Sequence, residues 1–306
     1  MTAQGVVLLD TNQLPIKGDF GGAFWRSVRF LCATKGLRLA LPDIVVHESV
    51  NLKTTEATAW AESFRVSHRN LSGIVALEPI YVPEPREMSR AWRDSLESAF
   101  EVIPVHGDDA MESLKREALR EWPAQKGYGS RDSAIWLTVV RLAKTGAHVY
   151  LVTNNSQDFG KGDLRPELMA ELSEVTGAVS YIPTVQAFVA AIATRIDRPT
   201  LSEDTATSLL AETARDRALE IRDVIDFESI TLDDILDSTV IFSEIRAFDA
   251  YVIDSHAIAN ISGRFTLAYP GGLVFASGSF NTWLDYEPET GIFTSNDLGD
   301  VHIDFR

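Results

Sequence analysis

The stretch GVVLLDTNQL, residues 5–14, decides how the chain begins to fold. Its consecutive large apolar residues run directly into Asp10. A short apolar run bounded by turn residues is typical of a strand covered on both faces, as in a parallel sheet. Ligands of open α/β sheets bind beyond the carboxyl ends of the strands, so Asp10 lies where chemistry is usually done. The alternative is that Asp10, Thr11 and Asn12 only cap or turn the chain.

Length and composition set the broad class of the protein. The chain has 306 residues, 45% of them hydrophobic, which suits about two domains with real cores. It shows neither a signal-peptide pattern nor an apolar run of membrane length, and this predicts a soluble, cytoplasmic protein without a membrane partner. The single cysteine, Cys32, excludes an internal disulfide framework and a thiolate zinc site. Its helical apolar setting predicts a buried residue.

The formal charge of −16 is unevenly distributed along the chain. Residues 1–200 carry 24 acidic and 22 basic side chains, a balance of −2. Residues 201–306 carry 20 acidic and 6 basic side chains, a balance of −14. The first two thirds therefore keep enough Lys and Arg to meet phosphates, and the overall charge does not exclude a nucleic-acid partner.

Helical and strand patterns alternate through the first two thirds of the chain. Strand patterns are LRLALP, AHVYLVTNN and VSYIP, and helical patterns cover residues 23–36, 43–71, 85–101, 107–121, 130–146, 165–176 and 184–196. This alternation predicts an α/β fold, a three-layer α/β/α domain with a mostly parallel sheet, over residues 1–198.

The pattern changes near Pro199. Residues 199–237 are expected to form a linker and a charged helix, the helix over 203–227. From residue 238 to 306 the chain predicts a small, acidic, antiparallel β domain with strands STVIFSEI, FDAYVIDSHAIANISG, RFTLAYPGG, LVFASGSFNTWLDY, GIFTS and VHIDF.

Polar residues recur where predicted strands end and where predicted helices begin. LVTNNSQDF places Thr153, Asn155 and Asp158 at a strand end, and parallel strands bring such ends to one edge of a sheet. Glu48 and Asp132 lie in the opening turns of two helices. Helix N-termini favour carboxylates, so each acid also has an ordinary structural explanation.

The motifs in this order resemble the PIN domain. D-T-N at the first strand, P-x-x-V-x-x-E, G-x-R-D-x-x-I-W and V-T-N-N-x-x-D-F are similar to a bacterial branch described mainly as a domain of unknown function. The resemblance covers roughly residues 5–190. It implies an α/β/α fold whose acidic cluster binds Mg²⁺ or Mn²⁺. It also implies a nuclease, since many such domains are ribonucleases of toxin–antitoxin systems or RNA processing.

By this resemblance the catalytic and metal-binding candidates are Asp10, Glu48, Asp132 and Asp158. Hard divalent ions take oxygen ligands, and an ion relieves the repulsion among crowded carboxylates. The family often has an acid where this chain has Asn155, so either Asp158 takes that place or only three carboxylates remain.

Further residues are expected to support the cluster. Thr11, Asn12, Thr153 and Asn155 would orient the ligands through hydrogen bonds. Arg131 and Lys126 are candidates for contact with a substrate phosphate. The alternatives are a surface ion pair for Arg131 and a solvated face for Lys126.

Other functions remain open on the sequence. Asn12 replaces the general acid of a haloacid-dehalogenase-like enzyme, and neither a phosphate-binding loop nor a dinucleotide fingerprint is present. A hydrolase of another phosphoester, or a PIN-like scaffold that binds RNA or protein without cutting, stays an alternative. RNA is the expected substrate ahead of DNA. The chain could form a homo-oligomer, and the acidic domain could dock a protein partner or restrain activity.

Overall fold

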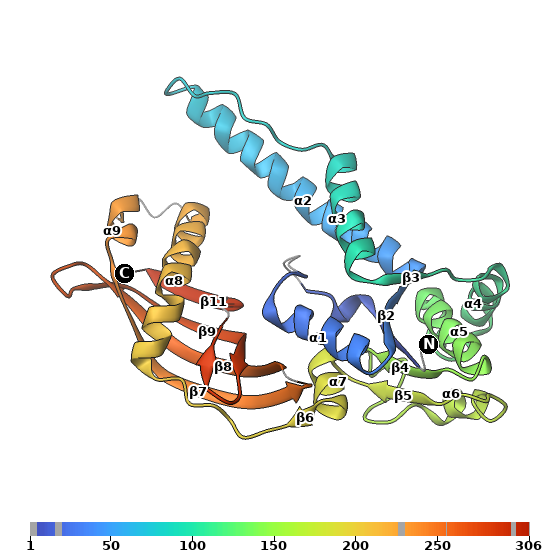
Figure 1. Cartoon of the computed structure of the whole chain (residues 1–306). Coiled ribbons are helices and arrows are strands. Elements are labelled where there is room, and N and C mark those ends of the chain that lie inside the picture. Colours follow the sequence, from blue (N-terminus) through green and yellow to red (C-terminus); the bar gives the residue numbers. More distant parts are fainter. Residues whose placement is uncertain (1–4, 16–19, 226–229, 255, 295–297, 306) are drawn as a thin grey trace. The chain divides into compact units, whose positions relative to one another are not determined.

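The computed structural model describes residues 5–15, 20–225, 230–254, 256–294 and 298–305 (Figure 1). The chain divides into two compact units. The first comprises residues 1–20 and 35–188, and the second comprises 21–34 and 189–306. None of the described helices is long and apolar enough to cross a membrane.

The first unit is built on a parallel sheet of five strands in the order β3-β2-β1-β4-β5. The strands are β1 (Gly5–Leu9), β2 (Leu37–Pro42), β3 (Glu101–Ile103), β4 (His148–Val152) and β5 (Val179–Ile182). Every residue of the central β1 is buried, as its apolar run predicted. The register pairs Leu9 with Val152, so β1 and β4 end side by side. This sheet confirms the predicted α/β class.

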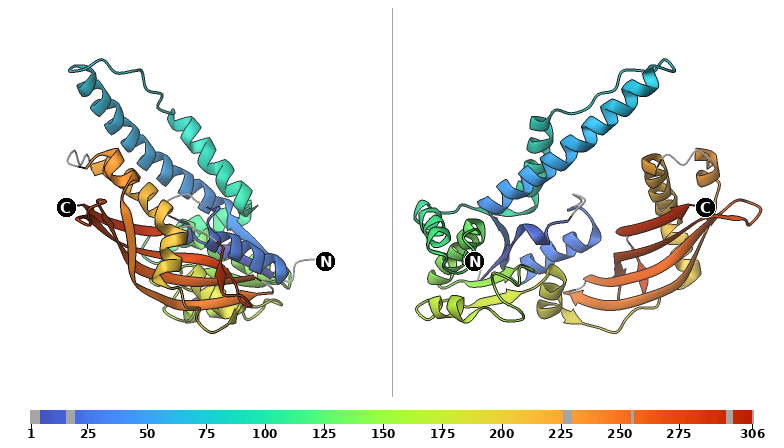
Figure 2. Two further views of the ribbon diagram at one scale, coloured as in Figure 1. Left: turned by 60° about the vertical axis from the view of Figure 1, so that its left-hand side comes forward. Right: turned by 180° about the vertical axis from the view of Figure 1, so that it is seen from behind.

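Helices connect and flank these strands. They are the 3₁₀ turn η1 (Thr11–Gln13), α2 (Asp43–Ser72), α3 (Pro85–Ala99), α4 (Gly107–Leu119), α5 (Ser130–Lys144) and α6 (Pro166–Glu171), and the boundary between the two units falls within α7 (Val185–Ile192). Most of α5 is buried, and Trp136 on it is fully enclosed in the core. By contrast α2 is buried mainly over its first turns and then extends outward with α3 beside it (Figure 2).

Several predicted helix ends in this part of the chain were wrong. The helix expected over 165–176 already ends at Glu171, where turns follow. Strand pairing ends two other helices early. The helix expected over 85–101 ends at Ala99, because Glu101 joins the sheet as the first residue of β3. The helix expected over 184–196 ends at Ile192, because Thr194 and Arg195 form β6 (Thr194–Arg195) and pair with the longest strand of the second unit. In both places backbone pairing with a distant strand overrode local helical periodicity.

The second unit contains an antiparallel sheet in the order β10-β9-β8-β7-β6, with β11 paired to β9. Its other strands are β7 (Thr239–Ile253), β8 (His256–Ala268), β9 (Val274–Glu287), β10 (Ile292–Phe293) and β11 (Asp300–Phe305). The antiparallel prediction is confirmed. Two predicted strand limits were wrong: FDAYVIDSHAIANISG contains the end of β7 and the start of β8, and RFTLAYPGG begins inside β8. Ser295 of the predicted strand GIFTS lies outside the described residues.

The pairing of β7 with β8 contains two irregularities. The register shifts between Ser243 and Arg246 and again between Ala247 and Asp249. Glu244 at the first shift has a φ of 53°, the left-handed conformation typical of a bulge residue. The chain therefore continues as one strand where the sequence predicted two separate strands, STVIFSEI and FDAYVIDSHAIANISG.

Two helices complete the core of the second unit. α8 (Glu203–Ile225) contributes Ala206, Leu210, Ala214 and Ala218, a four-residue spacing that forms one buried stripe. The helix that the sequence predicted as part of a linker therefore packs one of its faces into the core of the second unit. Residues 226 and 227 of its predicted span lie outside the described residues. A short helix, α9 (Leu232–Leu236), follows. The predicted boundaries at 198 and 237 remain predictions.

Helix α1 (Ala23–Thr34) also belongs to the second unit, although it follows β1 closely in sequence. The guanidinium of Arg26 pairs with Asp285 on β9 at 2.9 Å, and the ring of Phe24 lies 5.2 Å from that of Trp283. Cys32 on this helix is buried, as predicted, and burial raises the pKa of its thiol to about 12. A reactive thiolate is therefore disfavoured at this position.

Candidate functional site

Asp10 is a buried carboxylate surrounded by hydrogen-bond donors. Its Oδ1 accepts from the backbone N–H of Thr11 at 2.7 Å. Its Oδ2 accepts from Asn12 Nδ2 at 2.7 Å and from Thr153 Oγ1 at 2.6 Å. Burial raises the pKa of Asp10, and the hydrogen bonds from Thr153 and Thr11 oppose that rise. The side chain caps η1 and also faces the strand edge, so the structural and functional interpretations of this residue are compatible.

The polar turns after β1 and β4 meet, as the parallel order predicted. Asn12 Nδ2 also donates to Thr153 Oγ1 at 3.1 Å, and Asn12 Oδ1 accepts from the backbone N–H of Asn154 at 3.2 Å. The backbone N–H of Asn155 donates to Thr153 Oγ1 at 3.1 Å. Each of these bonds joins or supports the two turns, which fixes the orientation of the Asp10 carboxylate.

Glu48 on α2 is tied down on both carboxylate oxygens. Thr11 Oγ1 donates to its Oε2 at 2.8 Å, and Arg131 pairs with its Oε1. The negative charge of Glu48 contributes to the raised pKa of Asp10, after burial. The structure therefore places Glu48 beside the strand-end carboxylate but engages it with a cation from α5.

Asp132 lies in the first turn of α5, near the charges of Asp10 and Asp158. Burial and the nearby charges of Asp10 and Asp158 together raise its pKa to about 6, against the opposing effects of the Asn155 hydrogen bond and the charge of Arg131. Its one recorded hydrogen bond in the described structure comes from Asn155 Nδ2 to Oδ1 at 3.0 Å. Gly129 sets this position, because it caps α5 with a φ of 116° that other residues rarely adopt.

Asn155 joins two of the carboxylates through one amide group. Its Nδ2 donates to Asp132 Oδ1 at 3.0 Å and to Asp158 Oδ2 at 3.1 Å. The other oxygen of Asp158 accepts from Lys126 Nζ at 3.2 Å and from Gln125 Nε2 at 3.3 Å. A neutral N–H pair thus stands between two carboxylates, where the resemblance to the PIN domain implied a further acid.

The two predicted phosphate-binding residues both contact acids of this cluster. Arg131 is paired with Glu48, although its side chain is 59% exposed. Lys126 contacts Asp158 and also Gln157 Oε1, the latter at 2.9 Å. The surface ion pair considered for Arg131 is thus present, and a role of either residue toward phosphate remains a prediction.

The carboxylate oxygens of the cluster are the kind of ligand that a hard divalent cation prefers. The charge of Glu48 raises the pKa of Asp10, and the charges of Asp10 and Asp158 raise the pKa of Asp132; a cation would relieve that repulsion. Within the described ranges, however, no three His, Cys, Asp or Glu side chains lie close enough together to hold a metal ion. A bound ion would therefore require the carboxylate side chains to move closer together.

In the loop that precedes α5, sequence reasoning identified Lys126 but missed its neighbour Gln125. Gln125 and Lys126 of PAQKGYG reach across to Asp158, and the backbone of Gly127 bonds to Ala124 at 3.0 Å. The signal that could have identified Gln125 is its place beside Lys126, just before the pair of glycines that precedes the helix carrying Asp132.

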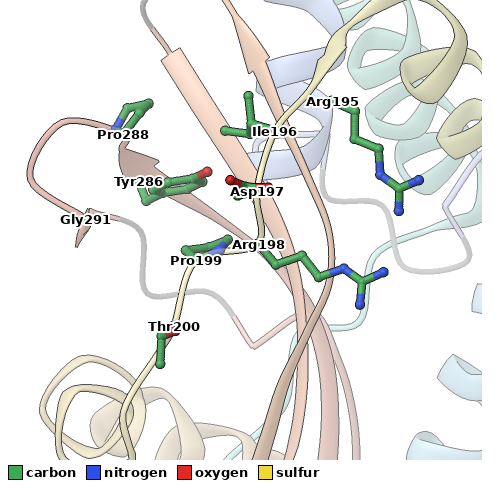
Figure 3. A pocket seen from close by; sticks show the side chains of 9 residues that line it. All are labelled: Arg195, Ile196, Asp197, Arg198, Pro199, Thr200, Tyr286, Pro288 and Gly291. Atoms are coloured by element: carbon green, nitrogen blue, oxygen red, sulfur yellow. The ribbon is translucent and has the colours of Figure 1, made fainter.

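A hollow lies within the second unit, and none of the residues predicted for the site lines it. It is lined by Arg195, Ile196, Asp197, Arg198, Pro199, Thr200, Tyr286, Pro288 and Gly291 (Figure 3). The side chains of Arg195 and Arg198 extend away from Tyr286 and Pro288, and Arg195 pairs with Asp249 at 2.7 Å. Its cationic groups do not converge, so it is the weaker candidate.

The fold and the strand-end cluster together define an α/β domain with an acidic site at the carboxyl edge of a parallel sheet. A family model described as a PIN domain matches residues 7–159, which is half of the chain. The chain therefore belongs to the PIN domain family, whose members are generally nucleases, and this supports a nuclease-like function. No curated protein and no solved structure matches the chain.

Proposed function

We propose that the protein hydrolyses phosphodiester bonds in RNA with the help of Mg²⁺ or Mn²⁺ held at the carboxylate cluster. One observation carries the proposal: Asp10, Asp132 and Asp158 concentrate negative charge at the carboxyl edge of the sheet, and that charge helps raise the pKa of Asp132. Perturbed carboxylates of this kind are more frequent at functional sites than elsewhere. Membership of the PIN domain family supports the same chemistry.

The proposed ligands are Asp10 and Asp132, with Glu48 and Asp158 completing the cluster. A divalent ion there would polarise the phosphoryl oxygens and lower the pKa of an attacking water. The chain's own part is to hold the carboxylates in place. Thr11, Asn12 and Thr153 orient Asp10. Asn155 orients Asp132 and Asp158.

Arg131 and Lys126 are proposed to change partner when substrate binds. Each now neutralises an acid of the cluster, through Glu48 and Asp158 respectively. A cation at the cluster would take over that neutralisation, and the two basic side chains could then contact the phosphates of the substrate.

The decisive experiment is cleavage of end-labelled single-stranded RNA and DNA with Mn²⁺, Mg²⁺ or EDTA. We expect metal-dependent cleavage of RNA by the wild type and its loss in Asp10→Asn. Asp94→Asn is the matched control, because that side chain is exposed on α3, outside the cluster. Cleavage that survives in Asp10→Asn, or a folded wild type that cleaves neither polymer with any ion, would refute the proposal.

A catalytically inactive scaffold is the second candidate. Asn155 favours it, since an amide stands where the family often has an acid and already bridges Asp132 and Asp158 without an ion. In a scaffold, RNA binding would survive Asp10→Asn and would not depend on a divalent ion. For either candidate function, we also propose a cytoplasmic location and a protein partner for the acidic C-terminal residues.

A further inference from the structure

The loop between α4 and α5 is fixed to the loop that carries Asp158. The guanidinium of Arg165 stacks on the ring of Trp122 at 3.9 Å, and Arg165 also bonds to the backbone oxygen of Gln157 at 2.6 Å. Arg116 donates to the backbone oxygen of Trp122 at 3.0 Å. Ala124 is fully buried. The loop therefore has a defined conformation beside the candidate site.

Tyr128 is the exception in this tightly held loop. It is 65% exposed, and no hydrogen bond to its hydroxyl is recorded in the described structure. The glycines on either side, Gly127 and Gly129, have φ values of 78° and 116°, so the backbone there adopts a shape that presents the ring outward. Tyr128 therefore presents an aromatic face to solvent from a loop that is held beside the candidate site.

The position of Tyr128 connects it to the carboxylate cluster. Lys126 Nζ lies 5.8 Å from the centre of the Tyr128 ring and 3.2 Å from Asp158 Oδ1. Asp132 follows four residues after Tyr128, in the first turn of the helix that Gly129 caps. A nucleotide with its phosphate near the cluster would thus have an aromatic face and an ammonium group within reach of its base.

We propose that the Tyr128 ring stacks on a base of the substrate and makes the protein selective for single-stranded nucleic acid. This rests on the proposed function, because it assumes that the adjacent cluster acts on a phosphodiester. Every base has a π-face, so stacking favours unpaired strands without reading sequence. Bases inside a duplex are already stacked on their neighbours and cannot present that face.

The rigid loop strengthens the effect of the ring. A side chain that is already exposed in a fixed backbone loses little conformational freedom on binding. Base stacking on one aromatic ring corresponds to about a 5- to 150-fold gain in affinity when judged by alanine substitution. Tyr128→Ala should therefore weaken single-strand binding by about that factor, and Tyr128→Phe should retain most of the affinity.

Binding is measured by fluorescence anisotropy of a labelled single-stranded RNA, in EDTA and with Asp10→Asn as the background so that no cleavage intervenes. Tyr128→Ala, Tyr128→Leu and Tyr128→Phe are compared with Tyr81→Ala. Tyr81 is a matched control, because it is 75% exposed in the segment between α2 and α3. A strand carrying 2-aminopurine reports stacking directly through quenching of its fluorescence.

We expect Ala and Leu at position 128 to weaken binding and abolish quenching, Phe to preserve both, and the Tyr81 control to change neither. Binding of an RNA duplex should change less than twofold in every variant. The inference fails if single-strand binding is unchanged in Tyr128→Ala, if Leu serves as well as Phe, or if no single strand binds. Since cleavage is not the readout, loss of the nuclease proposal would leave this result interpretable.

Discussion

Replacement of Asp132 by Asn should stabilise the protein in the absence of metal while abolishing its proposed activity. Asp132 is mostly buried and lies near the charges of Asp10 and Asp158. Its ionised form is therefore disfavoured in the folded state. Asparagine has the same shape, carries no charge, and can still accept the hydrogen bond that Asn155 now donates at 3.0 Å. The substitution removes the repulsion without leaving a cavity.

The magnitude follows from the pKa of Asp132. The folded state raises that pKa from 3.8 to about 6. A shift of one unit corresponds to 1.36 kcal/mol, so full ionisation of Asp132 costs about 3 kcal/mol of unfolding free energy. A raised pKa means that the folded state binds the proton more tightly than the unfolded state. The contribution to stability is present below pH 3.8 and is lost as the pH rises through about 6.

The assay is urea unfolding in EDTA at pH 4 and pH 8, followed by tryptophan fluorescence. Asp132→Asn should gain about 2 to 3 kcal/mol relative to the wild type on going from pH 4 to pH 8, since the remaining carboxylates titrate in both proteins. Asp94→Asn, exposed on α3, should show no such pH-dependent difference. Mg²⁺ should then stabilise the wild type more than Asp132→Asn, because an ion that binds the folded state shifts the unfolding equilibrium.

Two results would refute this reasoning. If Asp132→Asn is no more stable than the wild type at pH 8, the carboxylate is not under electrostatic stress. If the gain is the same at pH 4 and pH 8, its cause is something other than ionisation of Asp132. A melting curve that Mg²⁺ leaves unchanged in both proteins would count against a metal site built on this residue.

Three further substitutions test other contacts of the site. Thr153→Val should cost about 1–3 kcal/mol in urea unfolding, because it leaves a buried carboxylate one donor short; Thr138→Val, which removes only a bond to a helix carbonyl, should cost less. Asn155→Asp should tighten Mn²⁺ binding in a calorimetric titration and destabilise the metal-free protein, and weaker Mn²⁺ binding would contradict this. Arg131→Ala should reduce the salt dependence of RNA binding by about one counterion if Arg131 contacts phosphate; an unchanged slope would indicate that its charge remains committed to Glu48.

Local patterns were sufficient to predict much of the first unit. The apolar run ending at Asp10 fixed the central strand, and the repeated strand-then-polar-turn pattern placed Thr153 beside it. Both inferences depend only on residues adjacent in sequence and on the rule that parallel strands share an edge. The assignment of the four acids to metal binding remains a prediction.

Other features depend on contacts between distant residues. Arg131 and Glu48 are 83 positions apart, and no local pattern indicates which of several acids an exposed arginine will choose. The docking of α1 on β9 through Arg26 and Asp285 spans 259 positions. The predicted break in β7 was wrong because a bulge at Glu244 absorbs a charged residue without ending the strand. Periodicity describes one element at a time and does not identify its partners.

The hydrogen bonds of the cluster suggest which carboxylate would contribute most to the affinity for a metal ion. Asp10 receives three donors, and Glu48 and Asp158 each pair with a cation. Asp132 receives one hydrogen bond, from the neutral amide of Asn155; the charge of Arg131 lowers its pKa, yet burial and the neighbouring acids raise it to about 6. Because a cation stabilises most where negative charge is least compensated, we expect Asp132 to contribute more to metal affinity than Asp10, and Asp10 to act mainly by orienting what is bound. Mn²⁺ titration of Asp132→Asn and Asp10→Asn in parallel would show the larger loss of affinity in Asp132→Asn, and the reverse order would contradict this assignment.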